Sequence, residues 1–311
     1  MCHIKKNNYL CFEYCGIAMP QWRFNIYRLN SGMKNLIVRS LSGAVYAALI
    51  VCAIMFGGAW AFPALCTVFA ILGTGELTRL CYGTRTPALT ALDMAGAAIV
   101  VSAPAACLVC ASGGIYTASL AATGAFFVYF LARLICQLYL PGENAVGSIS
   151  AAFTSLMYVA MPLCCASMMY LMYGPSIILT MFIMIWLNDT GAFCVGSLIG
   201  KRRLFERISP KKSWEGFAGG LVFSIAGGAL IYFLFGKWAP GLGLAEMCTL
   251  GAVVSVFATW GDLVESLLKR TAGVKDSGHI MPGHGGILDR IDSLLLVAPA
   301  LACYMAALTL I

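Results

Sequence analysis

The amino-acid sequence predicts an all-α, polytopic integral membrane protein with about nine transmembrane helices. Three observations predict this fold class. Apolar residues make up 60% of the 311 residues and charged residues only 11%, whereas a soluble domain carries about 25% charged residues. The apolar residues are gathered in long uncharged runs, and a helix needs roughly 17–25 such residues to cross a bilayer. The Lys and Arg residues lie between the runs, in short loops.

The predicted helices follow in order from these runs. Three runs are too long for one helix, and each is divided by residues that interrupt helices. These runs and their dividing residues are 40–75 (Gly57-Gly58), 94–132 (Ser112-Gly113-Gly114) and 144–188 (Gly174-Pro175). Three further runs each predict one helix, over residues 216–235, 247–268 and 293–311.

The distribution of positive charge predicts the orientation in the membrane. Nine spans place the two termini on opposite sides. All of the 20 Lys and Arg residues except Lys237 then fall on one face. Cytoplasmic loops carry the excess of Lys and Arg, so we expect a multi-pass inner-membrane protein with a cytoplasmic N-terminus and an external C-terminus. Because the charges are distributed in this way, the net charge of +7 indicates membrane orientation and not nucleic-acid binding.

The chain divides into an N-terminal extension, residues 1–32, and one membrane-embedded domain, residues 33–311. The extension is polar and aromatic with scattered cysteines, and Met33 leads directly into the first predicted span. Two interpretations stay open: Met33 is the natural start, or the extension is a genuine cytoplasmic segment.

Carboxylates near one membrane face indicate a site. Asp262 and Glu265 are three residues apart on one predicted helix, so they share a face. Asp289 and Asp292 have the same spacing at the start of the last span. Because a charge in the membrane costs on the order of 2.5–3.5 kcal/mol by insertion scales, such residues need a reason to be there. Salt bridges at a helix end are the alternative, but the number of carboxylates favours a site.

The residue types favour phosphate chemistry. Carboxylates hold Mg²⁺ together with substrate phosphates, Lys and Arg neutralise the remaining phosphate charge, and glycines let backbone amides approach an anion. Lys211 and Lys212 precede a helix predicted to start near Trp214, where a phosphate can meet both ammonium groups and the helix N-terminus. A membrane anchor that needs only positive charge is the alternative for these two lysines.

Three motifs resemble those of a known family. Ser266–Arg270, Lys275–Gly278 and Pro282–Asp292 together resemble the signature of the phosphatidate cytidylyltransferases, over 27 residues with fixed spacing. Upstream, Asn188–Phe193 with Gly196 and Gly200-Lys201 resembles a second family motif, and Ser209–Gly216 a third. The N-terminal half resembles the family mainly in its spans and in Arg39 and Glu76.

The resemblance implies that a phosphate oxygen of phosphatidate attacks the α-phosphorus of CTP, giving CDP-diacylglycerol and pyrophosphate without a covalent enzyme intermediate. It implies Mg²⁺ or a similar cation as cofactor, CTP and phosphatidate as substrates, and the lipid bilayer as partner, and it leaves a homo-oligomer open. The expected catalytic residues are Asp262, Asp276, Asp289 and Lys275. The expected metal ligands are the same three aspartates, with Asp292 and Asp189 as further candidates. The expected phosphate-binding residues are Ser209, Lys211, Lys212, Lys269, Arg270, His284, Gly285, Gly286 and Arg290.

Two other functions account for part of this pattern. A transporter of an anionic solute would also carry charges in its spans, but here the charges gather in the last third of the chain, with no mirrored set in the first half. A CTP-dependent lipid-alcohol kinase is the nearest alternative among enzymes.

Overall fold

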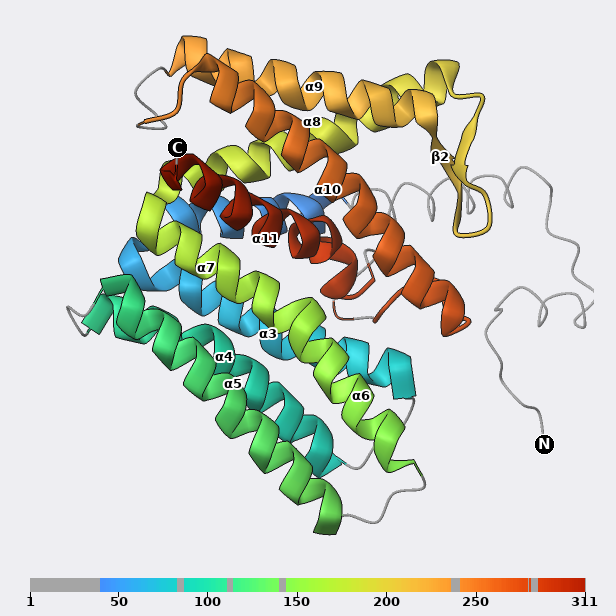
Figure 1. The fold of residues 1–311 in the computed structure, drawn as a ribbon. Coiled ribbons are helices and arrows are strands. Elements are labelled where there is room, and N and C mark those ends of the chain that lie inside the picture. Colours follow the sequence, from blue (N-terminus) through green and yellow to red (C-terminus); the bar gives the residue numbers. More distant parts are fainter. Residues whose placement is uncertain are drawn as a thin grey trace, which may run out of the picture.

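A computed structural model describes residues 40–82, 87–110, 114–139, 144–235, 241–278, 280 and 285–310. The proposed extension, Met33, Lys237 and His284 lie outside these residues. The chain forms a bundle of long helices with one small β-hairpin (Figure 1). A first helix covers Ser40–Met55. It is followed by α3 (Gly58–Tyr82), α4 (Pro87–Cys110), α5 (Gly114–Tyr139), α6 (Ala145–Ser155), the π-helical turn η1 (Leu156–Ala160), α7 (Met161–Tyr173), α8 (Pro175–Ile199), β1 (Arg203–Phe205), β2 (Ser209–Ser213), α9 (Trp214–Leu234), α10 (Leu244–Thr271) and α11 (Leu288–Leu310).

The predicted fold class is confirmed. Eight helical segments in the described part of the chain are long and apolar enough to cross a membrane, and α6, η1 and α7 together form one of them. The helix over Ser40–Met55 is apolar but shorter. A helix thus occupies each of the nine predicted positions, and the chain divides near Gly57, Gly114 and Gly174 as expected. The protein is a polytopic, all-helical membrane protein.

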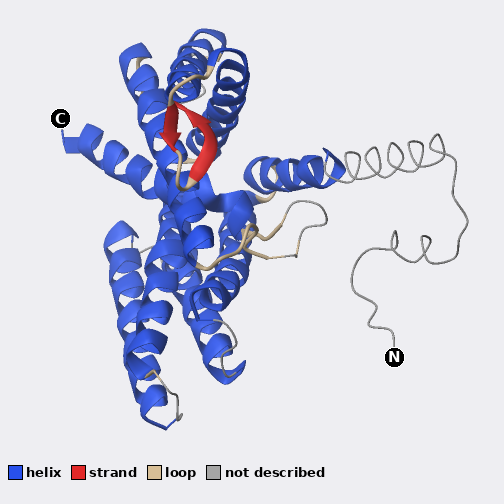
Figure 2. Ribbon diagram, turned by 90° about the vertical axis from the view of Figure 1, so that its right-hand side faces the viewer, coloured by secondary structure: helices blue, strands red, loops and turns tan. Residues whose placement is uncertain are grey.

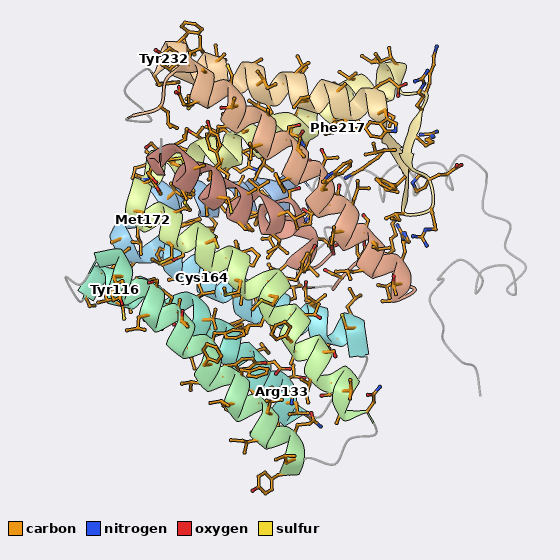
Figure 3. The ribbon with its side chains drawn as sticks, in the orientation of Figure 1. Tyr116, Arg133, Cys164, Met172, Phe217 and Tyr232 are labelled. Atoms are coloured by element: carbon orange, nitrogen blue, oxygen red, sulfur yellow. The ribbon has the colours of Figure 1, made fainter. Side chains whose placement is uncertain are left out.

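Several helices run beyond their predicted ends, because the predicted boundaries fall at charged residues that the helices include. α4 includes Asp93 and α5 includes Arg133, although both were placed outside the uncharged run. These two side chains are 1% and 2% exposed and form an ion pair of 2.9 Å. Arg133 also donates to Gln137 Oε1 at 2.9 Å and to Ser148 Oγ at 2.8 Å. A paired and hydrogen-bonded charge can be buried, so these helices continue past it (Figure 3).

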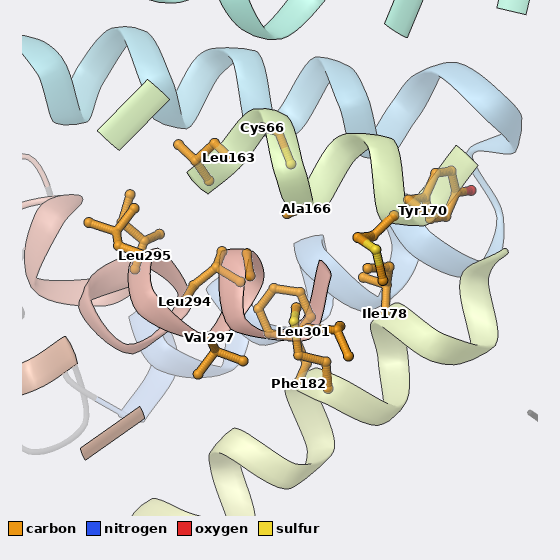
Figure 4. Close-up of a cluster of buried hydrophobic side chains, with 14 of the residues drawn as sticks. Cys66, Leu163, Ala166, Tyr170, Ile178, Phe182, Leu294, Leu295, Val297 and Leu301 are labelled. Carbon is orange, nitrogen blue, oxygen red and sulfur yellow. The ribbon is translucent and has the colours of Figure 1, made fainter. Parts of the chain in front are cut away.

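The helices pack in three groups (Figure 1). α3, α7 and α11 lie in the middle, α4 and α5 pair on one side, and α9 packs between α8 and α10 on the other. α10 also packs along α11. Figure 4 shows how side chains from the central helices, such as Leu163, Tyr170 and Leu301, meet in one apolar core with Phe182 of α8.

The β-hairpin was not predicted, and it projects from one end of the bundle between α8 and α9 (Figure 2). β1 and β2 are antiparallel, with Arg203 opposite Ser213. Ser213 then caps α9, because its Oγ accepts from the Gly216 N–H at 3.1 Å. α9 therefore begins at Trp214, as expected. The C-terminus of the chain lies toward the opposite end of the bundle (Figure 1).

Candidate active site

Close packing of α10 against α11 brings three carboxylates together. A Cβ at Gly261 of α10 would lie 2.6 Å from the main-chain oxygen of Asp292 in α11, so only glycine lets the two backbones approach this closely. The next residue, Asp262, consequently lies beside Asp292, and Glu265 lies one turn further along α10. Each of these three residues offers an oxygen atom within 4.8 Å of the other two. We call Asp262, Glu265 and Asp292 the carboxylate cluster.

The hairpin and α8 add charges beside the carboxylate cluster. Lys212, in β2, places its Nζ 2.7 Å from Asp262 Oδ2 and 3.4 Å from the Thr259 carbonyl. Asp189 of α8 interacts electrostatically with Asp262 and Lys212. The Lys212 and Asp262 side chains are 25% and 39% exposed, so the cluster is open to solvent on the side of the hairpin.

A second lysine joins the cluster to the start of α11. Lys269 Nζ lies 2.5 Å from Glu265 Oε2 and 2.6 Å from Asp289 Oδ1. The other oxygen of Asp289 accepts from the Ser277 N–H and Oγ, both at 2.9 Å, and from the Gly286 N–H at 2.8 Å. Asp289 thus ties Ser277 and Gly286, two residues of the segment between α10 and α11, to the first turn of α11.

Glu76 of α3 holds the same loop from the N-terminal half of the chain. Its carboxylate is 4% exposed and accepts from the backbone N–H groups of Ile287 at 3.0 Å and Leu288 at 2.8 Å, and from Ser277 Oγ at 3.1 Å. These N–H groups open helix α11, where a carboxylate satisfies unpaired donors and interacts favourably with the helix dipole. A Cβ at Gly278 would lie 2.5 Å from Glu76 Oε1, so this glycine makes room for the carboxylate.

The predicted site residues fall into three groups. Asp262 and Asp292 belong to the carboxylate cluster, and Asp189 and Lys212 interact with it. Lys269, Asp289 and Gly286 form the hydrogen-bonded start of α11. The remaining described residues border these groups: Lys211, Arg270, Lys275 and Asp276 are exposed, whereas Ser209, Gly285 and Arg290 are partly buried.

Asp276 and Asp289 were predicted to bind metal with Asp262. Gly285, at a φ of 83°, lies between them: its Cβ would be 2.5 Å from Asp289 Oδ2 and 3.5 Å from Asp276 Cβ. The two aspartates are therefore neighbours, but neither belongs to the carboxylate cluster. Their role as ligands stays a prediction.

The carboxylate cluster carries more negative charge than its lysines neutralise. Lys212 pairs with Asp262, and Lys269 is shared between Glu265 and Asp289. Among the described residues, Asp292 and Asp189 have no ion-pair partner, and Glu265 Oε1 has no hydrogen-bond partner. Buried carboxylates that stay charged need a compensating cation. Mg²⁺ prefers hard oxygen ligands and is commonly held by one or two carboxylates together with substrate phosphates, so these residues fit the predicted cofactor.

Two residues that complete this site carry no role in the sequence prediction. Glu265 was identified on the same helix face as Asp262 but was not assigned as a ligand, although it is 0% exposed. Glu76 was quoted only as a weak resemblance. The signal available for it was a lone acidic residue directly after the uncharged run over residues 40–75.

Comparisons with known proteins agree on one family. The model of a family described as "Cytidylyltransferase family" matches residues 37–308. Proteins named phosphatidate cytidylyltransferase are similar to this chain: that of Staphylococcus saprophyticus is 48% identical over 128 residues, and that of Bacillus subtilis 47% over 134 residues. These alignments cover 41% and 43% of this chain and 48% and 49% of the relatives. The chain thus spans about half the length of the curated relatives it matches.

Proposed function

This chain belongs to the cytidylyltransferase family, and from this premise we propose that it transfers a cytidylyl group from CTP to phosphatidate. The products are CDP-diacylglycerol and pyrophosphate. Relatives named phosphatidate cytidylyltransferase support the choice of substrate. The observation that carries the proposal is a single charged cluster. It joins Asp262 and Glu265 of α10 to Asp292 of the family signature in α11 and to Lys212 of the third family motif in β2.

The chemistry needs two anions to meet. A phosphate oxygen of phosphatidate forms a bond to the α-phosphorus of CTP, the bond from that phosphorus to the bridging oxygen breaks, and pyrophosphate leaves with the electron pair. Lys212 is the residue best suited to bind a phosphate, because it is partly exposed and can exchange Asp262 for a substrate oxygen. Lys269 is held by two carboxylates, so its part is to fix the start of α11 and the loop before it.

A divalent cation completes this proposal. Asp262, Glu265 and Asp292 would hold Mg²⁺, with Asp189 beside them. When bound, the cation would screen the repulsion between the two phosphates and stabilise charge on the departing pyrophosphate. The protein itself orients the substrates, because holding the reacting groups in line supplies a large part of the rate acceleration.

The site would face the cytoplasm in the inner membrane. This orientation rests on the positive-inside distribution, and it would let soluble CTP reach a lipid headgroup at the membrane surface. The basic hairpin and the start of α11 lie at the same end of the bundle as the carboxylate cluster. The C-terminus would then be external.

Position-specific labelling of CTP tests the proposal against its rivals. Purified protein in lipid–detergent micelles is incubated with CTP labelled at either the α- or the γ-phosphorus, with phosphatidate or with a polyprenol. Cytidylyl transfer moves only the α-label into lipid and requires phosphatidate. A lipid-alcohol kinase would move only the γ-label, and a transporter would move neither. Absence of α-labelled lipid with phosphatidate and Mg²⁺ present would refute the proposed function.

A further inference from the structure

One turn of the long helix between α6 and α7 departs from α-helical geometry. Leu156–Ala160 form a π-helical turn, in which the Met161 N–H bonds the Leu156 carbonyl five residues back. Pro162 explains the departure: it has no N–H for the Tyr158 carbonyl four residues earlier, and its ring would press on that carbonyl. Such turns are rare and occur frequently at functional sites. The extra residue changes the direction in which Tyr158 projects.

The π-helical turn and the start of α11 both lie against Gly73 of α3. A Cβ at Gly73 of α3 would lie 2.9 Å from Val159 Cγ1 and 3.7 Å from Ile291 Cδ1. The neighbours of these two residues, Tyr158 and Asp292, therefore lie in the same region of the bundle. Tyr158 interacts electrostatically with all three members of the carboxylate cluster.

The Tyr158 hydroxyl has no hydrogen-bond partner among the described residues, although the oxygen is buried. A buried O–H that makes no bond is unfavourable, and Tyr hydroxyls usually find a partner when buried. The three carboxylates that interact with it electrostatically are acceptors, yet none bonds it. The donor is therefore available to a ligand held at the cluster. Unlike Lys212 or Lys269, it offers a hydrogen bond without adding a charge.

We propose that Tyr158 is a further substrate-binding residue, whose hydroxyl donates a hydrogen bond to a phosphate oxygen of the substrate held at the carboxylate cluster. The inference rests on the proposed function and adds to it a residue from the middle of the chain, more than 100 residues before the signature. The phosphate belongs either to CTP or to phosphatidate. Phosphate oxygens of CTP and of phosphatidate accept hydrogen bonds in the same way, and the experiment distinguishes the two substrates.

Tyr158→Phe is the decisive variant, because it removes the hydroxyl and keeps the ring. Loss of a hydrogen bond to a charged group predicts a fall of about tenfold or more in kcat/KM. A rise in KM for only one substrate identifies the phosphate concerned. Tyr170→Phe is the matched control, since this hydroxyl is in α7 and donates to the Gly58 carbonyl at 2.9 Å. Its kinetic constants should match those of the wild type.

Three kinetic outcomes overturn the inference. They are unchanged constants in Tyr158→Phe, an equal loss in Tyr170→Phe, and a change confined to the Mg²⁺ concentration that gives half-maximal activity. The last would mean that the hydroxyl serves the metal ligands and not the phosphate.

A binding measurement without turnover separates this inference from the proposed function. The unfolding temperature of the purified protein is measured with CTP alone and with phosphatidate alone. We expect at least one to raise it in the wild type, and Tyr158→Phe to lose most of that rise. If the wild type is stabilised but forms no CDP-diacylglycerol, the proposed function fails. The difference in unfolding temperature between the wild type and Tyr158→Phe still tests the Tyr158 contact. A full rise in Tyr158→Phe, or none in the wild type with either compound, rejects the contact.

Discussion

Replacing Glu76 by glutamine tests whether α3 holds the loop before α11. The carboxylate is buried and accepts from the N–H groups of Ile287 and Leu288, and it shares the single Ser277 hydroxyl proton with Asp289. Glutamine keeps one acceptor oxygen and places an NH₂ donor against a backbone donor. At least one bond is therefore lost and the others lose their charge assistance. Since hydrogen bonds to charged groups contribute about 1.5–3 kcal/mol each, we expect the free energy of unfolding to fall by about 2–4 kcal/mol.

Catalysis should suffer more than folding in this variant. The loop also carries Gly286 and Ser277, which hold Asp289. A displacement of about 1 Å at such a position can cost about a hundredfold in rate, and we expect that loss in kcat/KM for α-labelled CTP. Glu246→Gln is the control, because it makes the same change in the first turn of α10, at the other end of that helix from the cluster. Wild-type stability and activity in Glu76→Gln would refute this role for α3.

Gly278→Ala approaches the same contact from the loop. Its Cβ would lie 2.5 Å from Glu76 Oε1, and the hydrogen bonds from Ile287 and Leu288 prevent the carboxylate from moving aside. We expect Gly278→Ala to lower activity strongly alone but to add little in the Glu76→Ala background. Strictly additive effects of the two changes would mean that the residues do not act through each other.

Four other predictions follow from the fold and the site. Lys212→Ala should lower kcat/KM at least about tenfold more than Lys211→Ala, because Lys212 has a charged partner among the described residues and Lys211 has none there; equal losses would indicate that the two lysines serve only as positive charges at the membrane. Activity should vanish with excess chelator and return with Mg²⁺. Removing the charge of a predicted ligand should lower activity about a hundredfold while the protein level stays normal; the variants are Asp262→Asn, Asp276→Asn, Asp289→Asn and Asp292→Asn. Full activity in chelator would exclude a required cation. Arg133→Leu should destabilise the protein by about 3–5 kcal/mol in thermal unfolding, since it leaves Asp93 buried without its ion-pair partner; an unchanged transition would show that the pair is not needed. A reporter after Pro240 should be external and one near Arg207 cytoplasmic, and the reverse signals would overturn the orientation.

The positions of the helices could be predicted because a bilayer imposes a strict pattern. Uncharged runs of sufficient length, divided at glycine, located every helix in the described residues. The ends of the helices could not be predicted from the ends of the uncharged runs. Asp93 and Arg133 can lie within apolar helices because they form an ion pair between α4 and α5. The two residues are 40 positions apart, so no local sequence pattern indicates the pair.

The candidate site was predictable only where it is local in sequence. Asp262 and Glu265 share a helix face, and that spacing is visible in one stretch of chain. Joining them to Asp292 depends on the close approach at Gly261, and joining them to Lys212 depends on a hairpin that the sequence analysis did not identify. Tyr158 could not be found from spacing at all, because a π-helical turn shifts the helical period at that residue.

The contact between Glu76 and the start of α11 has a consequence for how the protein is made. Its partners are separated by 211 and 212 residues of chain, so α3 is synthesised and inserted long before the backbone that it holds. An unfinished chain can contain the hairpin, α10 and most of the signature while the loop still lacks a fixed position. The C-terminal third is therefore not a portable catalytic module, and activity should appear only when the last membrane helix docks against the earliest ones. Two co-expressed fragments, divided within residues 236–240, should regain activity together, and neither fragment should have it alone.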